Sequence, residues 1–319
     1  MAYSYLEFER PIAELTEKID ELSQMGSSRE MDIAEEVEKL TKKRDLLIEK
    51  TYGQATRGQI AQLSRHPDRP NFLDYLPLIF DDFQELHGDR AFADDAAIVG
   101  GIARFGSHSV MLVGHQKGRD TKEKIRRNFG MARPEGYRKA LRLFHLAERF
   151  GMPVMTFIDT AGAWPGIDAE ERGQSEAIAR NLMELAVLKV PVLCTVIGEG
   201  GSGGALAIGV GDRLYMQQLT TYSVISPEGC AAILWRDRAF ADKAAEALKP
   251  TVADLQELGL VDEVIPEPKE GAHRNLEEAA KMISAVLEKG LREVLATPLH
   301  SLLKQREERL RNIGAFTED

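Results

Sequence analysis

Cysteine is scarce in this sequence, and the features of membrane and secreted proteins are missing. The 319 residues include only two cysteines, Cys194 and Cys230. Two thiols cannot build a disulfide framework or a four-cysteine zinc site, so we expect no metal ion on this chain. No apolar run approaches the ~18 residues of a membrane-spanning helix, and the first residues lack the apolar stretch of a signal peptide. These absences predict a cytoplasmic protein outside the membrane.

Positive charge is also in short supply. The chain has 41 Lys and Arg against 51 Asp and Glu, a formal net charge of −10. Bulk electrostatics therefore argue against a nucleic-acid partner. Residues 117–142 are the exception, because ten basic and three acidic residues give this basic segment a local charge of +7. Two interpretations of it stay open: a site for phosphate groups or an acidic partner, and a charged surface without a ligand.

The N-terminal residues predict a unit of their own. Apolar residues at helical spacing predict helices over 9–24 and 31–50, joined by a turn at 25–28. We expect this helical hairpin to form one domain over residues 1–55 and the rest of the chain a second domain over 56–319. A solvated pair of charged helices without a partner is the alternative for the hairpin.

Strands and helices alternate after a loop-rich stretch at 67–95. Such alternation predicts an α/β fold with largely parallel strands buried on both faces. Cys194 lies in the middle of one strand and is expected in the core. The expected strands are 97–105, 109–116, 154–158, 191–197, 213–217 and 221–226, and the expected helices are 134–150, 169–188, a short one near 204, one from Ser226 as N-cap, and the region beyond about 270.

Two turns stand out because each follows a buried strand and is rich in glycine. They are DTAGAWPG at 159–166 and GEGGSGG at 198–204. Ligands of parallel α/β proteins gather at the carboxyl ends of the strands. The second turn fits three patterns: a dinucleotide fingerprint, a nucleophile elbow centred on Ser202, and a helix start whose free amides face a developing oxyanion.

Residues elsewhere in the chain distinguish between these three patterns. A dinucleotide site needs an acidic residue about 20 positions after the glycines, and 215–225 contain none. No phosphate loop for ATP is present either. A hydrolase would need Ser202, a later aspartate and His273 in that order, and this possibility stays open. The oxyanion interpretation asks only for backbone amides, and one such donor can lower a barrier by ~3–4 kcal/mol. Glycines that only allow tight strand–helix packing are the remaining alternative.

Four long blocks of the sequence resemble one protein family. They are GHQKGRDTKEKIRRNFGMARPEGYRKALRL, DTAGAWPGIDAEERGQSEAIARN, VIGEGGSGGALAIGVGD and YSVISPEGCAAILW. They look like the carboxyltransferase α subunit of bacterial-type, multi-subunit acetyl-CoA carboxylase, and the similarity extends over nearly the whole chain, including the N-terminal hairpin.

The resemblance implies a fold, a reaction and partners. The fold is a crotonase-like (ClpP/crotonase) spiral of ββα units with the N-terminal hairpin and C-terminal helices. The reaction moves a carboxyl group from carboxybiotin, held on a separate carrier protein, to acetyl-CoA and gives malonyl-CoA for fatty acid synthesis. The partners are a zinc-ribbon β subunit in an α2β2 heterotetramer, the biotin carboxyl carrier protein, and a biotin carboxylase that uses the ATP. The α side is associated with biotin and the β side with CoA.

Within that family, the glycine turns predict the site. We expect the amides of Gly203 and Gly204 to hold the ureido oxygen of biotin as charge develops on it. The surrounding biotin pocket is expected to comprise Gly162, Ala163, Trp164, Gly201 and Ala205. Trp164 could instead be a core aromatic. Two alternative functions stay open: a carboxyltransferase for another acyl-CoA, and a scaffold subunit without catalytic residues.

Overall fold

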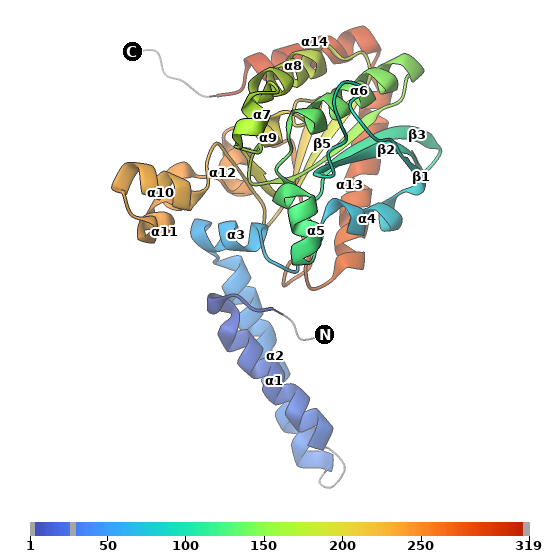
Figure 1. The fold of residues 1–319 in the computed structure, drawn as a ribbon. Helices are drawn as coiled ribbons and strands as arrows, with labels where there is room; N and C mark the ends of the chain where they lie inside the picture. The colour runs from blue at the N-terminus through green and yellow to red at the C-terminus, as the bar shows by residue number, and fades with distance from the viewer. Residues whose placement is uncertain (1–3, 26–29, 315–319) are drawn as a thin grey trace, which may run out of the picture.

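The N-terminal helices form a hairpin that extends away from the body of the molecule (Figure 1). The computed structural model describes residues 4–25 and 30–314. After the short 3-10 helix η1 (Glu7–Glu9), α1 spans Arg10–Met25 and α2 spans Glu30–Gly53. Both predicted helices are confirmed, whereas all but the first residue of the predicted turn at 25–28 lie outside the described residues. The expected domain boundary after residue 55 stays a prediction.

One mixed sheet forms the centre of the described part of the chain. Its order is β1-β2-β3-β4-β5-β6-β8, and β7 pairs with β5 beside this path. The first three strands are antiparallel and the remaining pairs are parallel. The strands are β1 (Asp81–Glu85), β2 (Ile98–Phe105), β3 (His108–His115), β4 (Val154–Thr160), β5 (Val192–Gly201), β6 (Arg213–Gln217), β7 (Thr221–Ser223) and β8 (Glu263–Ile265).

Helices cover both faces of this sheet. On one face, α6 (Pro134–Phe150) and α8 (Gln174–Val187) pack on a cluster that includes Met111 and Val113. On the other face, α4 (Phe72–Ile79) and α13 (Leu276–Ala296) pack on a cluster that includes Leu112. Successive residues of a strand therefore point into opposite cores, as expected of strands buried on both sides.

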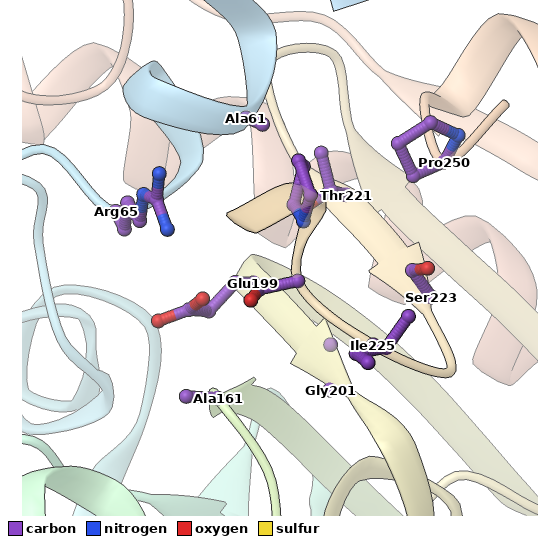
Figure 2. Close-up of a pocket in the computed structure, with 12 residues that line it drawn as sticks. Ala61, Arg65, Ala161, Glu199, Gly201, Thr221, Ser223, Ile225 and Pro250 are labelled. Carbon is purple, nitrogen blue, oxygen red and sulfur yellow. The ribbon is translucent and has the colours of Figure 1, made fainter. Parts of the chain in front are cut away.

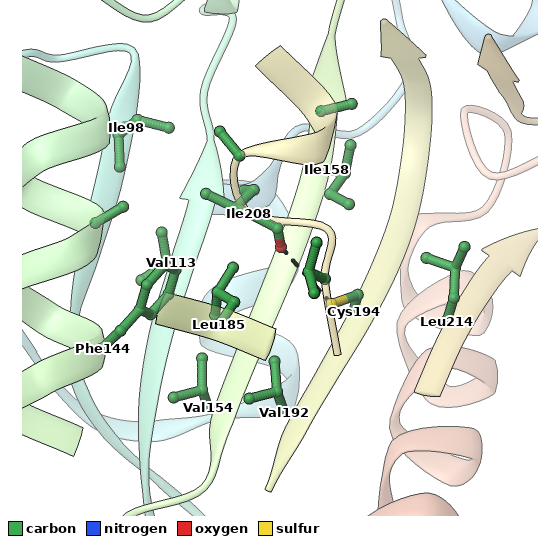
Figure 3. Packing of buried hydrophobic residues seen from close by; sticks show 14 of the residues in the cluster. Ile98, Val113, Phe144, Val154, Ile158, Leu185, Val192, Cys194, Ile208 and Leu214 are labelled. Carbon is green, nitrogen blue, oxygen red and sulfur yellow. Dashed lines mark hydrogen bonds between the residues drawn. The ribbon is translucent and has the colours of Figure 1, made fainter. Parts of the chain in front are cut away.

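The first of these cores lies against β4 and β5 (Figure 3). Phe144 from α6 and Leu185 from α8 lie over Val154 and Val192, and all four side chains are fully buried. Cys194 is fully buried among them, which confirms its predicted core position, and burial raises the pKa of its thiol to about 11.

The other helices connect these layers. They are α3 (Arg57–Ser64), α5 (Thr121–Arg126), η2 (Asn128–Gly130), α7 (Ile167–Glu170), α9 (Ser202–Leu206), α10 (Pro227–Trp235), η3 (Arg238–Phe240), α11 (Ala241–Leu248), α12 (Val252–Glu257) and α14 (Leu299–Arg311). The predicted start of α10 is confirmed, because Ser226 Oγ accepts a hydrogen bond of 3.1 Å from the Gly229 amide. Across the described residues, no helix has the length and apolar character that crossing a bilayer requires.

Three local predictions were wrong. The stretch 67–95 holds α4 and β1 in addition to loops, and Pro77 inside α4 made this helix hard to recognise. The helix predicted over 169–188 is two helices, because Gly173 adopts a left-handed conformation (φ 80°) between α7 and α8. The strand predicted over 221–226 ends at Ser223, because Ser226 already caps α10.

Candidate active site

The two glycine turns predicted at neighbouring strand ends are in direct contact. A Cβ atom on Gly204 would lie 2.5 Å from the carbonyl carbon of Gly162 and 2.7 Å from the amide nitrogen of Ala163. A Cβ atom on Gly201 would overlap the carbonyl oxygen of Ala161. Only glycine permits so close an approach of two backbones. The turn after β4 and the turn after β5 therefore form one structural unit.

Helix α9 begins inside this unit. Gly203 and Gly204 are in its first turn, where amides have no acceptor within the helix. Among the described residues, neither amide donates a hydrogen bond to another group of the chain. The helix begins at Ser202, whose φ of 50° is left-handed and unusual for a residue other than glycine. Both amides thus keep unused hydrogen-bonding capacity, and their role toward a ligand oxygen stays a prediction.

The other predicted pocket residues occupy different surroundings. Gly201 lines a small cleft beside β7, and Figure 2 shows Arg65 and Glu199 on the same side of it. Ala205 is fully buried, so its methyl group belongs to the core. Trp164 is half-buried; its Nε1 donates to Asp168 Oδ1 at 3.1 Å, and the Arg133 guanidinium carbon lies 5.2 Å from its ring centre. The roles given to these residues stay predictions.

A buried ionic cluster beside the glycine turns was missed by the sequence analysis. Lys117 Nζ lies 2.8 Å from Asp159 Oδ1 and 2.6 Å from Glu199 Oε1. Burial lowers the pKa of Lys117, but the two carboxylates outweigh it and raise that pKa above its usual value. Burial raises the pKa of Asp159 although Lys117 opposes the change. One signal was available in the sequence, since each of the three residues lies within two positions of the end of one of three adjacent strands.

Comparison with known proteins identifies the family. A family model described as "Acetyl co-enzyme A carboxylase carboxyltransferase-like" matches residues 5–314. The chain belongs to this family. It is 62% identical over 314 residues to the acetyl-coenzyme A carboxylase carboxyl transferase subunit alpha of Neisseria meningitidis serogroup A, which covers 98% of both chains. It is 60% identical to the protein of the same name from Chromobacterium violaceum, over 100% of this chain and 99% of that one.

Solved structures confirm the predicted crotonase-like, carboxyltransferase type of fold. A Pseudomonas malonate decarboxylase hetero-tetramer in complex with coenzyme A superposes with a TM-score of 0.55 at 17% identity, over 68% of this chain and 90% of that one. The transcarboxylase 12S structure gives a TM-score of 0.53 at 22% identity, over 70% of this chain and 44% of that one. At these identities the likeness concerns the fold alone.

For this member of the carboxyltransferase-like family, the basic segment is mostly neutralised inside the chain. Its cations are held by nearby carboxylates, and Arg142 donates to the backbone carbonyls of His87 and Gly88. The ion pairs are Lys117 with Asp159 and Glu199, Arg119 with Asp74, Arg127 with Glu123, Arg133 with Asp168, Arg138 with Asp89, and Lys139 with Asp94. Within the described ranges, Lys122, Lys124 and Arg126 make no ion pair. These pairings within the chain favour the interpretation without a ligand.

The hydrolase interpretation loses its general base. The side chain of His273 is fully buried, and its ring stacks on that of His66 with 4.1 Å between centroids. Its Nε2 lies 3.9 Å from Glu9 Oε1, so the ring belongs to a cluster beneath the N-terminal hairpin. Cys230 packs with Ala231 and Ala244 in a small buried cluster, as expected of a structural residue. Among the described residues, no set of three or more His, Cys, Asp or Glu could hold a metal ion.

Proposed function

We propose that this chain is the carboxyltransferase α subunit of an acetyl-CoA carboxylase. With a β subunit it transfers a carboxyl group from carboxybiotin to acetyl-CoA, and the malonyl-CoA product serves fatty acid synthesis. The observation that carries the proposal is family membership over residues 5–314, together with full-length relatives of that name at about 60% identity. The contact between the two glycine turns supports a site for this function there.

The residues of the site suit a substrate oxygen that becomes negatively charged. Carboxybiotin, delivered by the carrier protein as a substrate, supplies an activated carboxyl group. Gly203 and Gly204 would donate their amides to its ureido oxygen, where charge develops as that group leaves. Gly162 and Ala163 lie against Gly204 and would fix the direction of these amides. The nearby backbone of Gly201 would form the edge of the same pocket.

Other subunits complete the proposed enzyme. The name of the relatives denotes one subunit of a larger assembly, which supports a multi-subunit enzyme. The proposed partner is a zinc-ribbon β subunit in an α2β2 heterotetramer. A biotin carboxyl carrier protein would bring the biotin, and a biotin carboxylase would use ATP to load it. The proposed place of work is the cytoplasm. Transfer to an acyl-CoA other than acetyl-CoA is the second candidate for the substrate.

Reconstitution tests this proposal. The purified chain is mixed with its candidate β subunit, malonyl-CoA and biocytin, and carboxyl transfer to biocytin is measured. We expect transfer that neither chain supports alone. Transfer by the β subunit alone would reduce this chain to a scaffold. A kcat/KM at least tenfold higher for methylmalonyl-CoA than for malonyl-CoA would assign the other acyl-CoA instead.

A further inference from the structure

Strand β5 changes partner just before the glycine turn. Residues Leu193–Val196 pair with β6, whereas Glu199–Gly201 pair with β7. The pairing with β4 shifts at the same place, because Ile158 faces Val196 but Thr160 faces Gly200. Between these pairs β5 has two residues more than β4. Such a bulge bends the strand and redirects the residues that follow it.

The side chains of Lys117, Asp159 and Glu199, here called the Lys117 cluster, lie at this bulge. Lys117 follows β3 by two residues, Asp159 belongs to β4, and Glu199 stands where β5 has switched to β7. Besides the two contacts to the lysine, the Glu199 amide donates to Asp159 Oδ1 at 3.2 Å. The side chains are 17%, 5% and 18% exposed for Lys117, Asp159 and Glu199. A single ammonium group thus joins the ends of three adjacent strands.

Two glycines leave room for the side chains of the Lys117 cluster. A Cβ atom on Gly198 would overlap the Asp159 carboxylate, and one on Gly130 would lie 2.8 Å from Lys117 Cγ. A Cβ atom on Gly203, in contrast, would lie 3.5 Å from Ile178 Cγ2, an ordinary contact. The chain therefore leaves room for the ionic cluster on one side of the turn, whereas Gly203 is not required by packing.

We propose that Lys117 is a positioning residue for carboxyl transfer. Its ion pairs with Asp159 and Glu199 hold the backbone of the β5 bulge in place, and the bulge sets the direction of the Gly203 and Gly204 amides. The inference rests on the proposed function of those amides. Lys117 acts through the bulge and through Glu199, which also lines the cleft beside Gly201. The cluster carries two carboxylates and one ammonium group, so loss of the cation leaves buried negative charge unpaired.

A matched pair of lysine substitutions tests this role. Lys139 is also buried, and its Nζ lies 2.6 Å from Asp94 Oδ1 and 2.7 Å from the Asp95 carbonyl oxygen, in contact with the loop before β2. In the reconstituted complex, Lys117→Met should lower kcat by ~10–100-fold with KM for malonyl-CoA within twofold, since small misplacements of reacting groups have effects of that size. Lys139→Met should lower the melting temperature but leave kcat within threefold of wild type.

A second variant separates positioning from stability. Glu199→Gln in the Lys117→Met background removes one unpaired carboxylate, so it should recover part of the lost melting temperature without recovering kcat. Recovery of kcat together with stability would overturn the positioning role. So would a wild-type kcat in Lys117→Met, or an equal loss of kcat in Lys139→Met.

Hydrogen exchange gives a readout that does not depend on the reaction. Amides of residues 198–206 should exchange at least fivefold faster in Lys117→Met and at the wild-type rate in Lys139→Met. Unchanged exchange in Lys117→Met would refute the positioning role even if transfer is observed. A wild-type complex without any transfer would refute the proposed function, while the exchange data would still show whether Lys117 orders the turn.

Discussion

Two buried polar clusters hold the molecule together at different places, and they respond differently to protons. The cluster beside the glycine turns consists of Lys117, Asp159 and Glu199. The cluster beneath the N-terminal hairpin consists of Glu9, Tyr52, His66 and His273. The first contains a lysine whose pKa is raised by Asp159 and Glu199, so it stays a cation near neutral pH. The second contains His66, whose pKa burial lowers to about 4, so its charge changes in acid.

The hairpin cluster joins segments that are far apart in the sequence. Tyr52 on α2 donates its hydroxyl hydrogen to Glu9 Oε1, and the Leu6 amide donates to Glu9 Oε2 at 2.6 Å. Burial alone would raise the pKa of Glu9, but His273, Tyr52 and the Leu6 amide lower it to about 2. Burial lowers the pKa of His66 to about 4, although Glu9 opposes the change. This comparison suggests that a permanently charged lysine fixes the geometry of the glycine turns. Titratable groups, in contrast, hold the N-terminal hairpin against the rest of the chain.

The sharpest test of the first region compares two adjacent glycines. Gly204→Ala places a methyl group against the backbone of Gly162, 2.5 Å from its carbonyl carbon. We expect a loss of ~10²–10³ in kcat, the size seen when one oxyanion donor is lost, with a destabilisation of ~1–3 kcal/mol from overpacking. Steady-state transfer and thermal unfolding measure the two effects.

Gly203→Ala is the matched control for the fold, because its methyl group would meet Ile178 Cγ2 at 3.5 Å. Its melting temperature should stay within 2 °C of wild type. A Gly203→Ala variant as unstable as Gly204→Ala would show that the whole turn is limited by packing, and the contrast between the two glycines would disappear.

Acidification should weaken the second region. His66 is neutral in the folded protein, with a pKa of about 4, whereas the unfolded chain binds a proton near pH 6.5. The stability that depends on neutral His66 is complete above pH 6.5 and is lost as the pH falls toward 4, by up to about 3 kcal/mol. Glu9, whose pKa is lowered from 4.5 to about 2, contributes above pH 4.5 and loses its contribution below it.

Urea unfolding at pH 7.5 and 5.0 checks this prediction. His66→Gln should reduce the difference between the two pH values. Lys117 itself contributes no slope in this window, because its pKa is raised above its usual value. An unchanged pH slope in His66→Gln would contradict the proposed contrast between the clusters.

A smaller effect is expected for the Tyr52 hydroxyl. Tyr52→Phe removes its hydrogen bond to Glu9 but keeps the ring, which packs in the cluster that contains Ile12, Ile48 and Leu219. We expect a loss of about 1–2 kcal/mol in the free energy of unfolding, with carboxyl transfer unchanged. A fall in kcat with the complex fully assembled would mean that the hairpin cluster affects the active site. The two clusters would then not act independently.

The smallest effect is expected on the surface of the hairpin. Lys42 Nζ lies 2.6 Å from Glu38 Oε1, but the two side chains are 73% and 67% exposed. Exposed pairs contribute little because water and salt screen them. Lys42→Met should leave the melting temperature and its pH dependence unchanged. A shift as large as that of Tyr52→Phe would imply that the outer hairpin contributes to docking.

Local patterns predicted the parts of the fold that depend on neighbouring residues. Helical spacing located α1 and α2, and the alternation of apolar strands with helices located β2 to β6. The helix α4 and strand β1 were missed, because Pro77 and the turn residues around them resemble a loop while Phe72 and Tyr75 are buried by partners distant in the sequence. The break at Gly173 was missed because an isolated glycine is compatible with a helix until its φ is known.

The sequence by itself determined the family, the α/β class and the two glycine turns at strand ends, because these follow from periodicity and from long contiguous blocks of residues. Only the tertiary structure decided that Gly204 touches Gly162, that Lys117 joins Asp159 to Glu199, and that His273 stacks on His66 instead of serving Ser202. Contacts of this kind depend on strand register and on a bulge in β5. A shift of one residue would change every side chain that faces the cluster, and no local pattern encodes it.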